Sequence, residues 1–346
     1  MANAAENTAC GMGGGPNESL GEEYWTEERR AEAERRATAK PFPMPKAGGG
    51  KRPATTGEAA PKGPPGSNAG HNPDSHADAK SAAAHLEPPG AGGATVDVQH
   101  PLVYPWTAVG KLSYTQNGKP DTGSGALISP NIVLTAGHCI YDKNNGGKSI
   151  EVDFYPSYGV GAQGRDPQKD PYYKFNCSYL AWRLAWSEDR DPAYDYGLAW
   201  IDAAPGNKLG WLGYAWNQPT NLTWTAYGYP PYTPTALTSG NTMKAVAGRY
   251  APSPIRPFPG MIGMTNNDMG HGSSGGPWVT TDPVIADWHD TWPYHVVGVN
   301  STIHAPPPIM SSPYFTQELH ELFDWISDPA NRNPRKPPPF PPPPRH

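Results

Sequence analysis

The sequence predicts an all-β fold in which one helix follows the last strand. Between residues 106 and 300, short runs of β-forming residues alternate with glycine, proline and asparagine. Many short strands separated by turn residues, with almost no helical periodicity, are typical of barrels and sandwiches. Near the C-terminus the pattern changes, because apolar residues from Phe315 to Ile326 recur at helical spacing and Pro329 closes the segment.

Ten segments are expected to form strands, most of them rich in β-branched or aromatic residues. In chain order they are 106–114, 125–128, 132–136, 150–155, 196–201, 224–228, 243–250, 261–264, 276–279 and 295–300. Turn-forming Gly, Pro, Asn and Asp lie between them. We therefore expect a folded, strand-rich region that begins near residue 103.

The two ends differ from this region in composition. Residues 1–95 are dominated by Gly, Pro, Ala, Glu, Lys and Arg, and the 346-residue chain holds 44 Pro and 39 Gly. Such a segment buries too little apolar surface to offset its ordering entropy, so we expect disorder, with one marginal solvated helix within residues 19–40. Eight of the 13 residues from 334 to 346 are proline, which predicts a polyproline II tail. This tail could bind a polyproline-binding module or act only as a stiff solubilising segment.

Charge and hydropathy argue against several function classes. The formal net charge is −5 at pH 7 and no long basic run occurs, which argues against nucleic-acid binding. No apolar run reaches the roughly 18 residues that a membrane-spanning helix needs. The N-terminus lacks the basic and apolar regions of a signal peptide.

Two short motifs carry the chemistry. Residues 135–139 read Thr-Ala-Gly-His-Cys and present His138, while residues 272–277 read Gly-Ser-Ser-Gly-Gly-Pro and present Ser274. A serine hydroxyl is a weak nucleophile until a base takes its proton. Glycines beside the serine leave backbone N–H groups free to stabilise an oxyanion. Together, and with an acidic candidate between them, the motifs predict hydrolysis of peptide bonds.

These motifs resemble those of the trypsin/chymotrypsin-like serine peptidases, and more narrowly their glutamyl-endopeptidase-like branch. Residues 123–139 resemble the strands that lead into the family's catalytic histidine, and residues 267–278 resemble its serine loop. The resemblance covers about residues 96–330. It implies two antiparallel Greek-key β-barrels followed by a helix, and a serine endopeptidase that needs no cofactor or metal. It also implies protein or peptide substrates and secretion, although no signal peptide is visible.

The resemblance assigns roles to individual residues. Ser274 would be the nucleophile, forming an acyl-enzyme, and His138 the general base and then the general acid, with a pKa near 6.5. Asp195, which heads an apolar strand, would orient the imidazole. The backbone N–H groups of Gly272 and Ser274 would form the oxyanion hole. Other candidates for the aspartate are Asp189, Asp191 and Asp202.

The resemblance leaves substrate preference open. Asp268 lies six residues before Ser274, where trypsin-like enzymes keep the carboxylate that binds Lys or Arg. The glutamyl-specific branch relies instead on a histidine in the strand after the serine, and Asn300 stands at that position. Ser301 and Thr302 would line the cleft and pair with the substrate backbone. Both an acidic and a basic preference remain compatible with the sequence.

Two further features bear on processing and stability. The first 95 residues could be a propeptide, with a new N-terminus near residues 94–96 completing the pocket. Ser273, however, replaces the aspartate that binds the new N-terminus in trypsin-like enzymes. Cys139 follows the histidine, where the family commonly has a disulfide, and Cys177 is the other cysteine of the folded region. The two either form a bridge or remain buried free thiols.

A hypothesis from another class is a protease-like binding protein without activity. Such a protein would recruit partners through the proline-rich tail. The complete Ser, His and Asp set argues against it, because inactive relatives of enzymes usually lose one member of the set.

Overall fold

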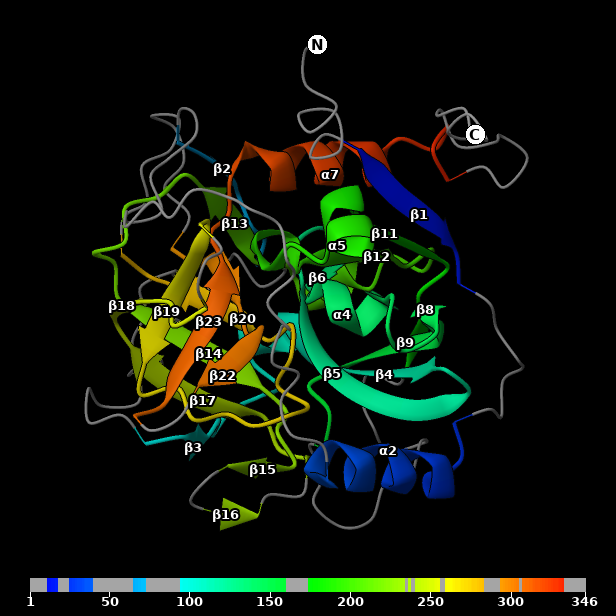
Figure 1. The fold of residues 1–346 in the computed structure, drawn as a ribbon, viewed down its shortest axis with the longest axis horizontal. Helices are drawn as coiled ribbons and strands as arrows, with labels where there is room; N and C mark the ends of the chain where they lie inside the picture. Colours follow the sequence, from blue (N-terminus) through cyan, green and yellow to red (C-terminus); the bar gives the residue numbers. More distant parts are fainter. Residues whose placement is uncertain are drawn as a thin grey trace.

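A computed structural model describes residues 11–17, 25–39, 65–72, 94–159, 174–233, 236–237, 240–255, 259–282, 293–304 and 307–332. Two units of curled β-sheet lie side by side, and a C-terminal helix, α7 (Gln317–Ser327), runs along the top (Figure 1). The predicted mostly-β fold with a C-terminal helix is confirmed. Residues 334–346, for which we expect a polyproline II tail, lie outside the described residues.

The first unit is one sheet of eight strands. They are β1 (Met12–Pro16), β4 (Val109–Gln116), β5 (Lys119–Leu127), β6 (Ile132–Thr135), β9 (Ile150–Pro156), β10 (Phe175–Asn176), β11 (Tyr179–Arg183) and β12 (Gly197–Trp200). Their order across the sheet is β1-β11-β12-β6-β5-β4-β9-β10, and every neighbouring pair is antiparallel. Asn117 and Gly118 both have positive φ and form the two-residue turn between β4 and β5.

The second unit combines a seven-stranded and a four-stranded sheet. The first contains, in spatial order, β2 (Gly66–Asn68), β13 (Gly213–Trp216), β21 (His295–Val299), β20 (Pro277–Thr280), β14 (Trp224–Gly228), β17 (Lys244–Gly248) and β3 (Val96–Asp97). The other contains β18 (Tyr250–Pro252), β19 (Met261–Thr265), β23 (Ile309–Pro313) and β22 (Thr302–His304). β13 and β21 pair in parallel over two residues, which departs from the expected antiparallel arrangement.

Short elements complete the fold. Two-stranded ribbons pair β7 (Tyr141–Asp142) with β8 (Gly147–Lys148) and β15 (Tyr232–Thr233) with β16 (Ala236–Leu237). The helical segments besides α7 are α2 (Glu27–Ala39), α4 (Gly137–Ile140), α5 (Leu184–Asp189), α6 (Gly206–Leu209), and the 3-10 turns η1 (Trp106–Ala108) and η2 (Pro192–Tyr194).

The strand predictions differ from the structure at several places. Residues 106–108 form η1 rather than the start of a strand, because Pro105 adopts a helical conformation and its carbonyl accepts the Ala108 N–H at 3.1 Å. The expected strand 243–250 is divided into β17 and β18 at Arg249. The prediction for β5 began at residue 125, whereas the strand begins at Lys119. From residue 96 onward, the short strands not predicted at all are β3, β7, β8, β10, β11, β13, β15, β16, β22 and β23.

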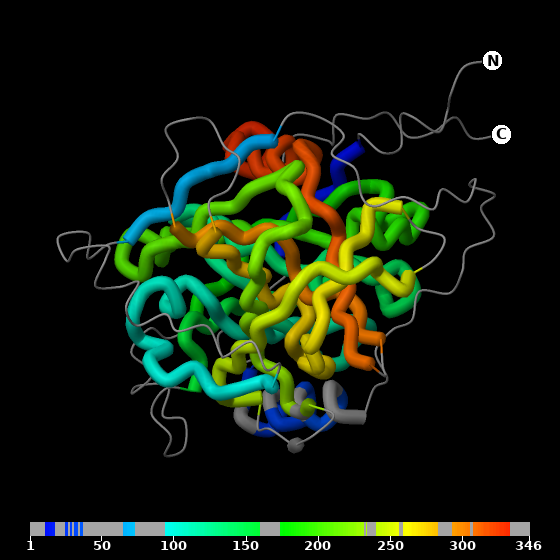
Figure 2. Tube along the Cα trace, turned by 90° about the vertical axis from the view of Figure 1, so that its left-hand side faces the viewer, coloured from blue at the N-terminus to red at the C-terminus, as the bar shows by residue number. Residues whose placement is uncertain are grey.

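Three segments within residues 1–95 form regular structure, where we expected disorder or a solvated helix. β1 extends the first sheet by pairing with β11, and β2 extends the second unit by pairing with β13. Glycine makes this possible: a Cβ added at Gly13 would lie 2.5 Å from the Trp182 ring, and one at Gly66 would lie 2.3 Å from the Trp216 ring. Figure 2 shows the segment that contains β2, in light blue, along the edge of the second unit.

Helix α2 is anchored to the first sheet rather than solvated. Trp25, just before it, is buried and donates its indole N–H to the Glu151 carbonyl at 2.9 Å. Ala33 on the helix is also buried. α2 lies against the lower side of the first sheet in Figure 1, next to β5.

The core forms two hydrophobic clusters. One is centred on the first unit and extends to residues of the second unit that pack against it, and the other lies within the second unit. α7 buries Leu319, Leu322 and Ile326 against the first of these. The fully buried Arg183 ties this helix to β11 through ion pairs with Glu318 and Glu321. Within the described residues, no helix is long and apolar enough to cross a membrane.

Candidate active site

His138 lies on α4, directly after strand β6, and faces Asp195. The Nδ1 atom of His138 donates to Asp195 Oδ2 at 2.9 Å, and the His138 backbone N–H donates to Asp195 Oδ1 at 2.8 Å. Asp195 follows η2 and heads the segment that leads into β12, which pairs with β6. The pairing of these two strands therefore brings together a histidine and an aspartate that lie 57 residues apart in the sequence.

The other acidic candidates have different partners. Asp191 caps η2 by accepting the Ala193 N–H, and Asp202 accepts the indole N–H of Trp200. Asp189 is exposed at the end of α5. Asp195 is thus the acidic candidate that the structure brings to His138.

Electrostatics reinforce this pair. Burial disfavours a charged imidazole, but the carboxylate of Asp195 outweighs it and raises the pKa of His138 well above its usual 6.5. Burial would raise the pKa of Asp195, but the charge of His138 and hydrogen bonds from His138 and Ser301 lower it. The aspartate is therefore ionised, and the imidazole is a stronger base than the unshifted value that we expected.

The serine loop is fixed against β5 and β6. Ser124 on β5 donates its backbone N–H to the Ser274 carbonyl at 2.7 Å and its hydroxyl to the Gly272 carbonyl at 2.8 Å. Gly275 has φ +81°, and a Cβ there would lie 2.1 Å from Thr135 Oγ1 and 2.5 Å from the Ala136 nitrogen. Glycine is therefore required where the serine loop approaches the histidine segment.

Ser274 Oγ and His138 Nε2 are both buried. Ser274 is 1% exposed, and neither Ser274 Oγ nor His138 Nε2 has a hydrogen-bond partner among the described residues. The hydroxyl is thus not yet bonded to the imidazole, as is common before substrate binds.

The geometry around Gly272 leaves two backbone donors unused. Gly272 has φ +86°, and a Cβ there would collide with Pro231 and the Tyr229 carbonyl. Within the described residues, neither the Gly272 nor the Ser274 N–H makes a hydrogen bond. Both donors belong to the turn that holds the serine and remain available to an oxyanion.

Asn300 was expected to contact substrate, but its side chain is fully buried beneath the serine loop. Its Oδ1 accepts from Asn267 at 2.9 Å and from the Trp278 indole at 2.8 Å, and its Nδ2 donates to the Ser273 carbonyl at 3.3 Å. All of its side-chain polar atoms are used inside the protein. Asn300 therefore supports the loop, and its polar side-chain atoms are already bonded within the protein rather than facing the substrate cleft as expected.

The other expected substrate-binding residues are also buried. Ser301 donates its hydroxyl to Asp195 Oδ2 at 2.6 Å, so it belongs to the His138–Asp195 pair. Thr302 begins β22 and is 4% exposed. Asp268 accepts a hydrogen bond from the hydroxyl of Thr95.

Of the two alternatives left open for Cys139 and Cys177, the structure shows buried free thiols and not a bridge. Cys139 points toward β5, where a Cβ added at Gly123 would lie 2.8 Å from its sulfur. Glycine at position 123 therefore leaves room for this sulfur. Cys177 lies beside β9, where burial raises the pKa of its thiol.

The sequence analysis did not predict the contacts or the burial of three further residues. Ser124 holds the serine loop through its hydrogen bond to the Gly272 carbonyl. Its position in a Gly-Ser-Gly run before the histidine motif was the feature of the sequence that could have indicated this role. His271 adjoins the serine loop and is buried, with Nε2 3.3 Å from Asp121 Oδ1. His304 on β22 has a buried Nε2 without a partner among the described residues, and burial lowers its pKa.

Comparison with known proteins places this geometry in context. The sequence model of the trypsin family matches residues 96–326, more than half of the chain. A protein called extracellular metalloprotease from Bacillus subtilis is 31% identical over 132 residues, which are 37% of this chain and 40% of that protein. The glutamyl endopeptidase of Bacillus licheniformis is 28% identical over 135 residues, 38% of this chain and 39% of that protein. The chain thus matches about two fifths of the length of these relatives.

The side chains of the described residues do not fit the metal ion that the name of the Bacillus subtilis relative suggests. Within the described residues, no three His, Cys, Asp or Glu side chains form a group that could hold a metal ion.

Solved structures share the fold. The protease Anisep from Arthrobacter nicotinovorans is 24% identical, with a TM-score of 0.52 over 63% of this chain and 94% of its own. The thermostable serine protease AL20 from an extremophilic microorganism is 23% identical, with a TM-score of 0.53 over 64% and 97%. A Glu endopeptidase is 20% identical, with a TM-score of 0.52 over 68% and 98%.

Proposed function

Because this chain belongs to the trypsin family, we propose that it is a serine endopeptidase that cleaves protein or peptide substrates through Ser274, His138 and Asp195. The observation that carries the proposal is the buried His138–Asp195 hydrogen bond of 2.9 Å beside the glycine-rich serine loop. A serine peptidase needs this pairing, because the aspartate fixes the tautomer in which Nε2 can accept a proton.

The mechanism follows from the atoms in place. Ser274 Oγ attacks the scissile carbonyl carbon as His138 Nε2 takes the hydroxyl proton. The carbonyl oxygen becomes an oxyanion, to which the Gly272 and Ser274 N–H groups donate. As the carbon–nitrogen bond breaks, His138 passes its proton to the leaving amine, and Ser274 holds the acyl group as an ester. Water then attacks this ester by the same route, releasing the acid and restoring the serine.

Asp195 acts throughout without changing its own protonation. Its lowered pKa keeps it ionised, so it stabilises the imidazolium that forms during each proton transfer. Ser301 supports this role by donating to the same carboxylate oxygen as His138 Nδ1.

We further propose that residues 1–95 act as a propeptide whose removal opens the site. Ser274 Oγ and His138 Nε2 are shielded from solvent in the full chain. Thr95 contacts Asp268 at the start of the serine loop, so cleavage near residues 94–96 would alter the support of that loop.

Labelling with a fluorophosphonate probe tests the catalytic proposal. The Ser274 oxygen would displace fluoride from phosphorus, and the adduct should map to Ser274 by peptide mass spectrometry. Wild type is compared with Ser274→Ala and with Ser253→Ala as a matched control, each before and after limited proteolysis of the N-terminal region. Labelling of wild type and Ser253→Ala but not Ser274→Ala supports the enzyme.

Two results would count against the proposals separately. Equal labelling of wild type and Ser274→Ala under both conditions would favour an inactive binding protein. If Ser274 is labelled equally before and after proteolysis, only the proposal that residues 1–95 act as a propeptide is refuted.

A further inference from the structure

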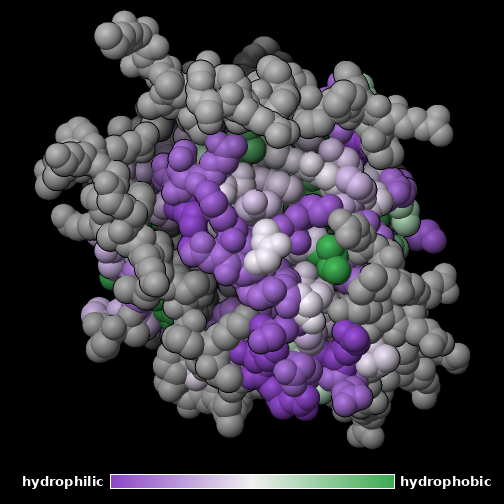
Figure 3. Space-filling view, turned by 45° about the vertical axis from the view of Figure 1, so that its right-hand side comes forward, coloured by the Kyte–Doolittle hydropathy of each residue, from purple (hydrophilic) through white to green (hydrophobic). Residues whose placement is uncertain are grey.

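Strand β5 carries polar side chains inside the protein, beside the turn that contains the serine. Polar residues usually lie at the surface, and on the face drawn in Figure 3 hydrophilic residues predominate among the described ones. Asp121 and Ser124 of β5 are instead buried, at 2% and 0% exposure, and both contact the serine loop. A buried polar group costs free energy unless it is hydrogen-bonded, so the partners of these two side chains indicate their role.

Ser124 is hydrogen-bonded through each of its polar atoms. Its backbone N–H donates to the Ser274 carbonyl at 2.7 Å, and its carbonyl accepts the Thr135 hydroxyl at 2.7 Å. Its hydroxyl donates to the Gly272 carbonyl at 2.8 Å and accepts the Tyr229 N–H at 2.9 Å. Two of these bonds therefore end on the residues whose N–H groups are the oxyanion donors of the proposed mechanism.

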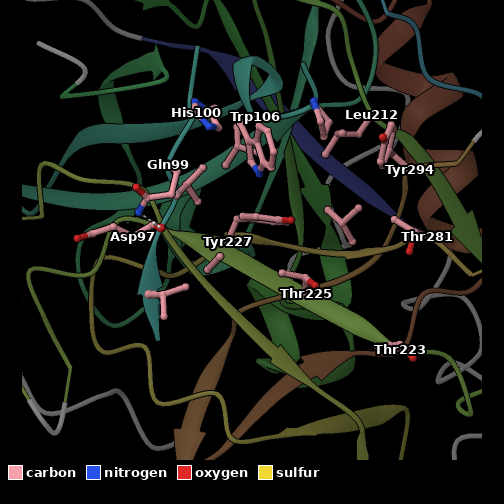
Figure 4. Close-up of a pocket in the computed structure, with 16 residues that line it drawn as sticks. Asp97, Gln99, His100, Trp106, Leu212, Thr223, Thr225, Tyr227, Thr281 and Tyr294 are labelled. Atoms are coloured by element: carbon pink, nitrogen blue, oxygen red, sulfur yellow. Dashed lines mark hydrogen bonds between the residues drawn. The ribbon is translucent and has the colours of Figure 1, made fainter. Parts of the chain in front are cut away.

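The Tyr229 N–H fixes the direction of the Ser124 hydroxyl. Tyr229 follows the end of β14, a strand held between β17 and β20. Tyr227 of the same strand lies in the cavity lining drawn in Figure 4, where it is hydrogen-bonded to Trp106. A hydroxyl has one proton, and an N–H that donates to its oxygen leaves this proton to point elsewhere, here to the Gly272 carbonyl. The bond to Gly272 is therefore built into the fold.

The peptide units on both sides of Gly272 are tied to β5. Before it, His271 is buried with Nε2 3.3 Å from Asp121 Oδ1. After it, the Gly272 carbonyl accepts the Ser124 hydroxyl. Gly272 has φ +86° and lacks the Cβ that restricts the backbone of other residues, so its peptide units could otherwise turn more freely. The two contacts therefore limit the directions in which the Gly272 N–H can point.

We infer that Ser124 is a positioning residue for the oxyanion hole: its hydroxyl holds the Gly272 peptide so that the Gly272 N–H stays available beside that of Ser274. Donors that are already in place when charge develops need no reorganisation during the reaction, which is the source of their large catalytic effect. Both bonds of the Ser124 hydroxyl go to backbone groups outside the His138–Asp195 pair. The inference rests on the proposed peptidase activity, because an oxyanion forms only if Ser274 attacks a carbonyl.

The test compares Ser124→Ala with a matched control, Ser312→Ala. Ser312 on β23 is also buried, and its hydroxyl likewise accepts one backbone N–H, that of Val299 at 2.9 Å, and donates to one carbonyl, that of Pro313 at 2.9 Å. The two variants therefore lose the same kinds of bond at different places. Both are made in the full chain and assayed before and after limited proteolysis of the N-terminal region.

The kinetic constants kcat and KM are measured on a fluorescent protein substrate. Removing a whole oxyanion donor costs about 10²- to 10³-fold in kcat. Loosening one donor should cost less, so we expect the kcat of Ser124→Ala to fall about 10- to 100-fold with KM nearly unchanged. Ser312→Ala should match wild type.

The pH profile separates positioning from general damage to the site. The Ser124 hydroxyl has no bond to His138, so kcat/KM of Ser124→Ala should keep the wild-type midpoint while its plateau falls. Ser124→Cys retains a weak donor of similar size and should lose less activity than Ser124→Ala. If Ser124→Ala does not fold, a reduced kcat with unchanged KM in Ser124→Cys supports the inference, and a wild-type kcat in Ser124→Cys contradicts it.

Four results would overturn the inference and leave the proposed peptidase intact. They are equal kcat values for wild type and folded Ser124→Ala, an equal loss in Ser312→Ala, a loss that falls on KM alone, and a shifted pH midpoint in Ser124→Ala. If the fluorophosphonate probe fails to label Ser274 of wild type before and after proteolysis, the proposed peptidase is refuted and the inference with it.

Discussion

Replacing Asp195 with asparagine should disable His138 while leaving the fold intact. The carboxylate accepts three hydrogen bonds: from the His138 backbone N–H at 2.8 Å, from His138 Nδ1 at 2.9 Å and from Ser301 Oγ at 2.6 Å. Asparagine offers one acceptor oxygen and one donor NH₂ in the same space. If its oxygen faces the backbone N–H, its NH₂ faces Nδ1 and forces Nδ1 to accept.

The tautomer then becomes wrong for catalysis. With Nδ1 as acceptor, the ring proton moves to Nε2, which can no longer take the proton of Ser274. The reversed amide instead sets its NH₂ against the His138 backbone N–H, so neither orientation keeps the native bonds. The known cost of this change in a Ser-His-Asp triad is about 10⁴ in turnover, which corresponds to roughly 5.5 kcal/mol at 1.36 kcal/mol per decade.

The assay compares kcat/KM on a fluorescent protein substrate for wild type, Asp195→Asn and Asp189→Asn. Asp189 is the matched control, because it is an exposed acid close in sequence. We expect a loss of about 10⁴ for Asp195→Asn and little change for Asp189→Asn. Retention of more than about a tenth of wild-type kcat/KM by folded Asp195→Asn would refute the tautomer argument, since a tenfold loss is only 1.36 kcal/mol.

Three further predictions concern the neighbours of this pair. Since the pKa of His138 is raised and the protonated ring cannot act as base, kcat/KM should rise with pH through a midpoint above 6.5, and a midpoint at or below 6.5 would contradict the geometry. Ser301→Ala should lower the free energy of unfolding in urea by about 1.5–3 kcal/mol, the contribution of a hydrogen bond to a charged group, and an unchanged midpoint would show that the bond contributes nothing. His271→Gln should lower kcat more than it raises KM, because the buried His271–Asp121 contact adjoins Gly272 rather than bound substrate; an effect on KM alone would place His271 in substrate binding.

The sequence could predict the parts of the site that depend on local pattern. The histidine and serine motifs each occupy a few consecutive residues, and their glycines are required by contacts such as that of Gly275 with Thr135. Strand 224–228 was predicted with its observed bounds because it holds Trp224, Thr225 and Tyr227, which are aromatic or β-branched, and glycine ends it. The amphipathic spacing of α7 was equally local.

What the sequence could not predict depends on contacts between distant segments. Ser301 was expected to face substrate, and only the folded chain brings its hydroxyl to Asp195, 106 residues away. Asn300 likewise has three partners from the serine loop and β20, so its burial was not visible in its neighbours. The ordered segments of residues 1–95 are polar or glycine-rich in composition, and their packing depends on Trp25, Trp182 and Trp216 filling space beside small residues.

A burst of p-nitrophenol from p-nitrophenyl acetate tests the central claim most directly. If Ser274 forms an acyl-enzyme, rapid mixing should release about one nitrophenol per active chain before the slower steady state. Intact-mass analysis of the quenched protein should show one acetyl group, mapped to Ser274. Ser274→Ala should show neither the burst nor the acetyl group. A burst and acetylation that persist in Ser274→Ala, or a complete absence of both in N-terminally processed wild type, would contradict the assignment of Ser274 as the nucleophile.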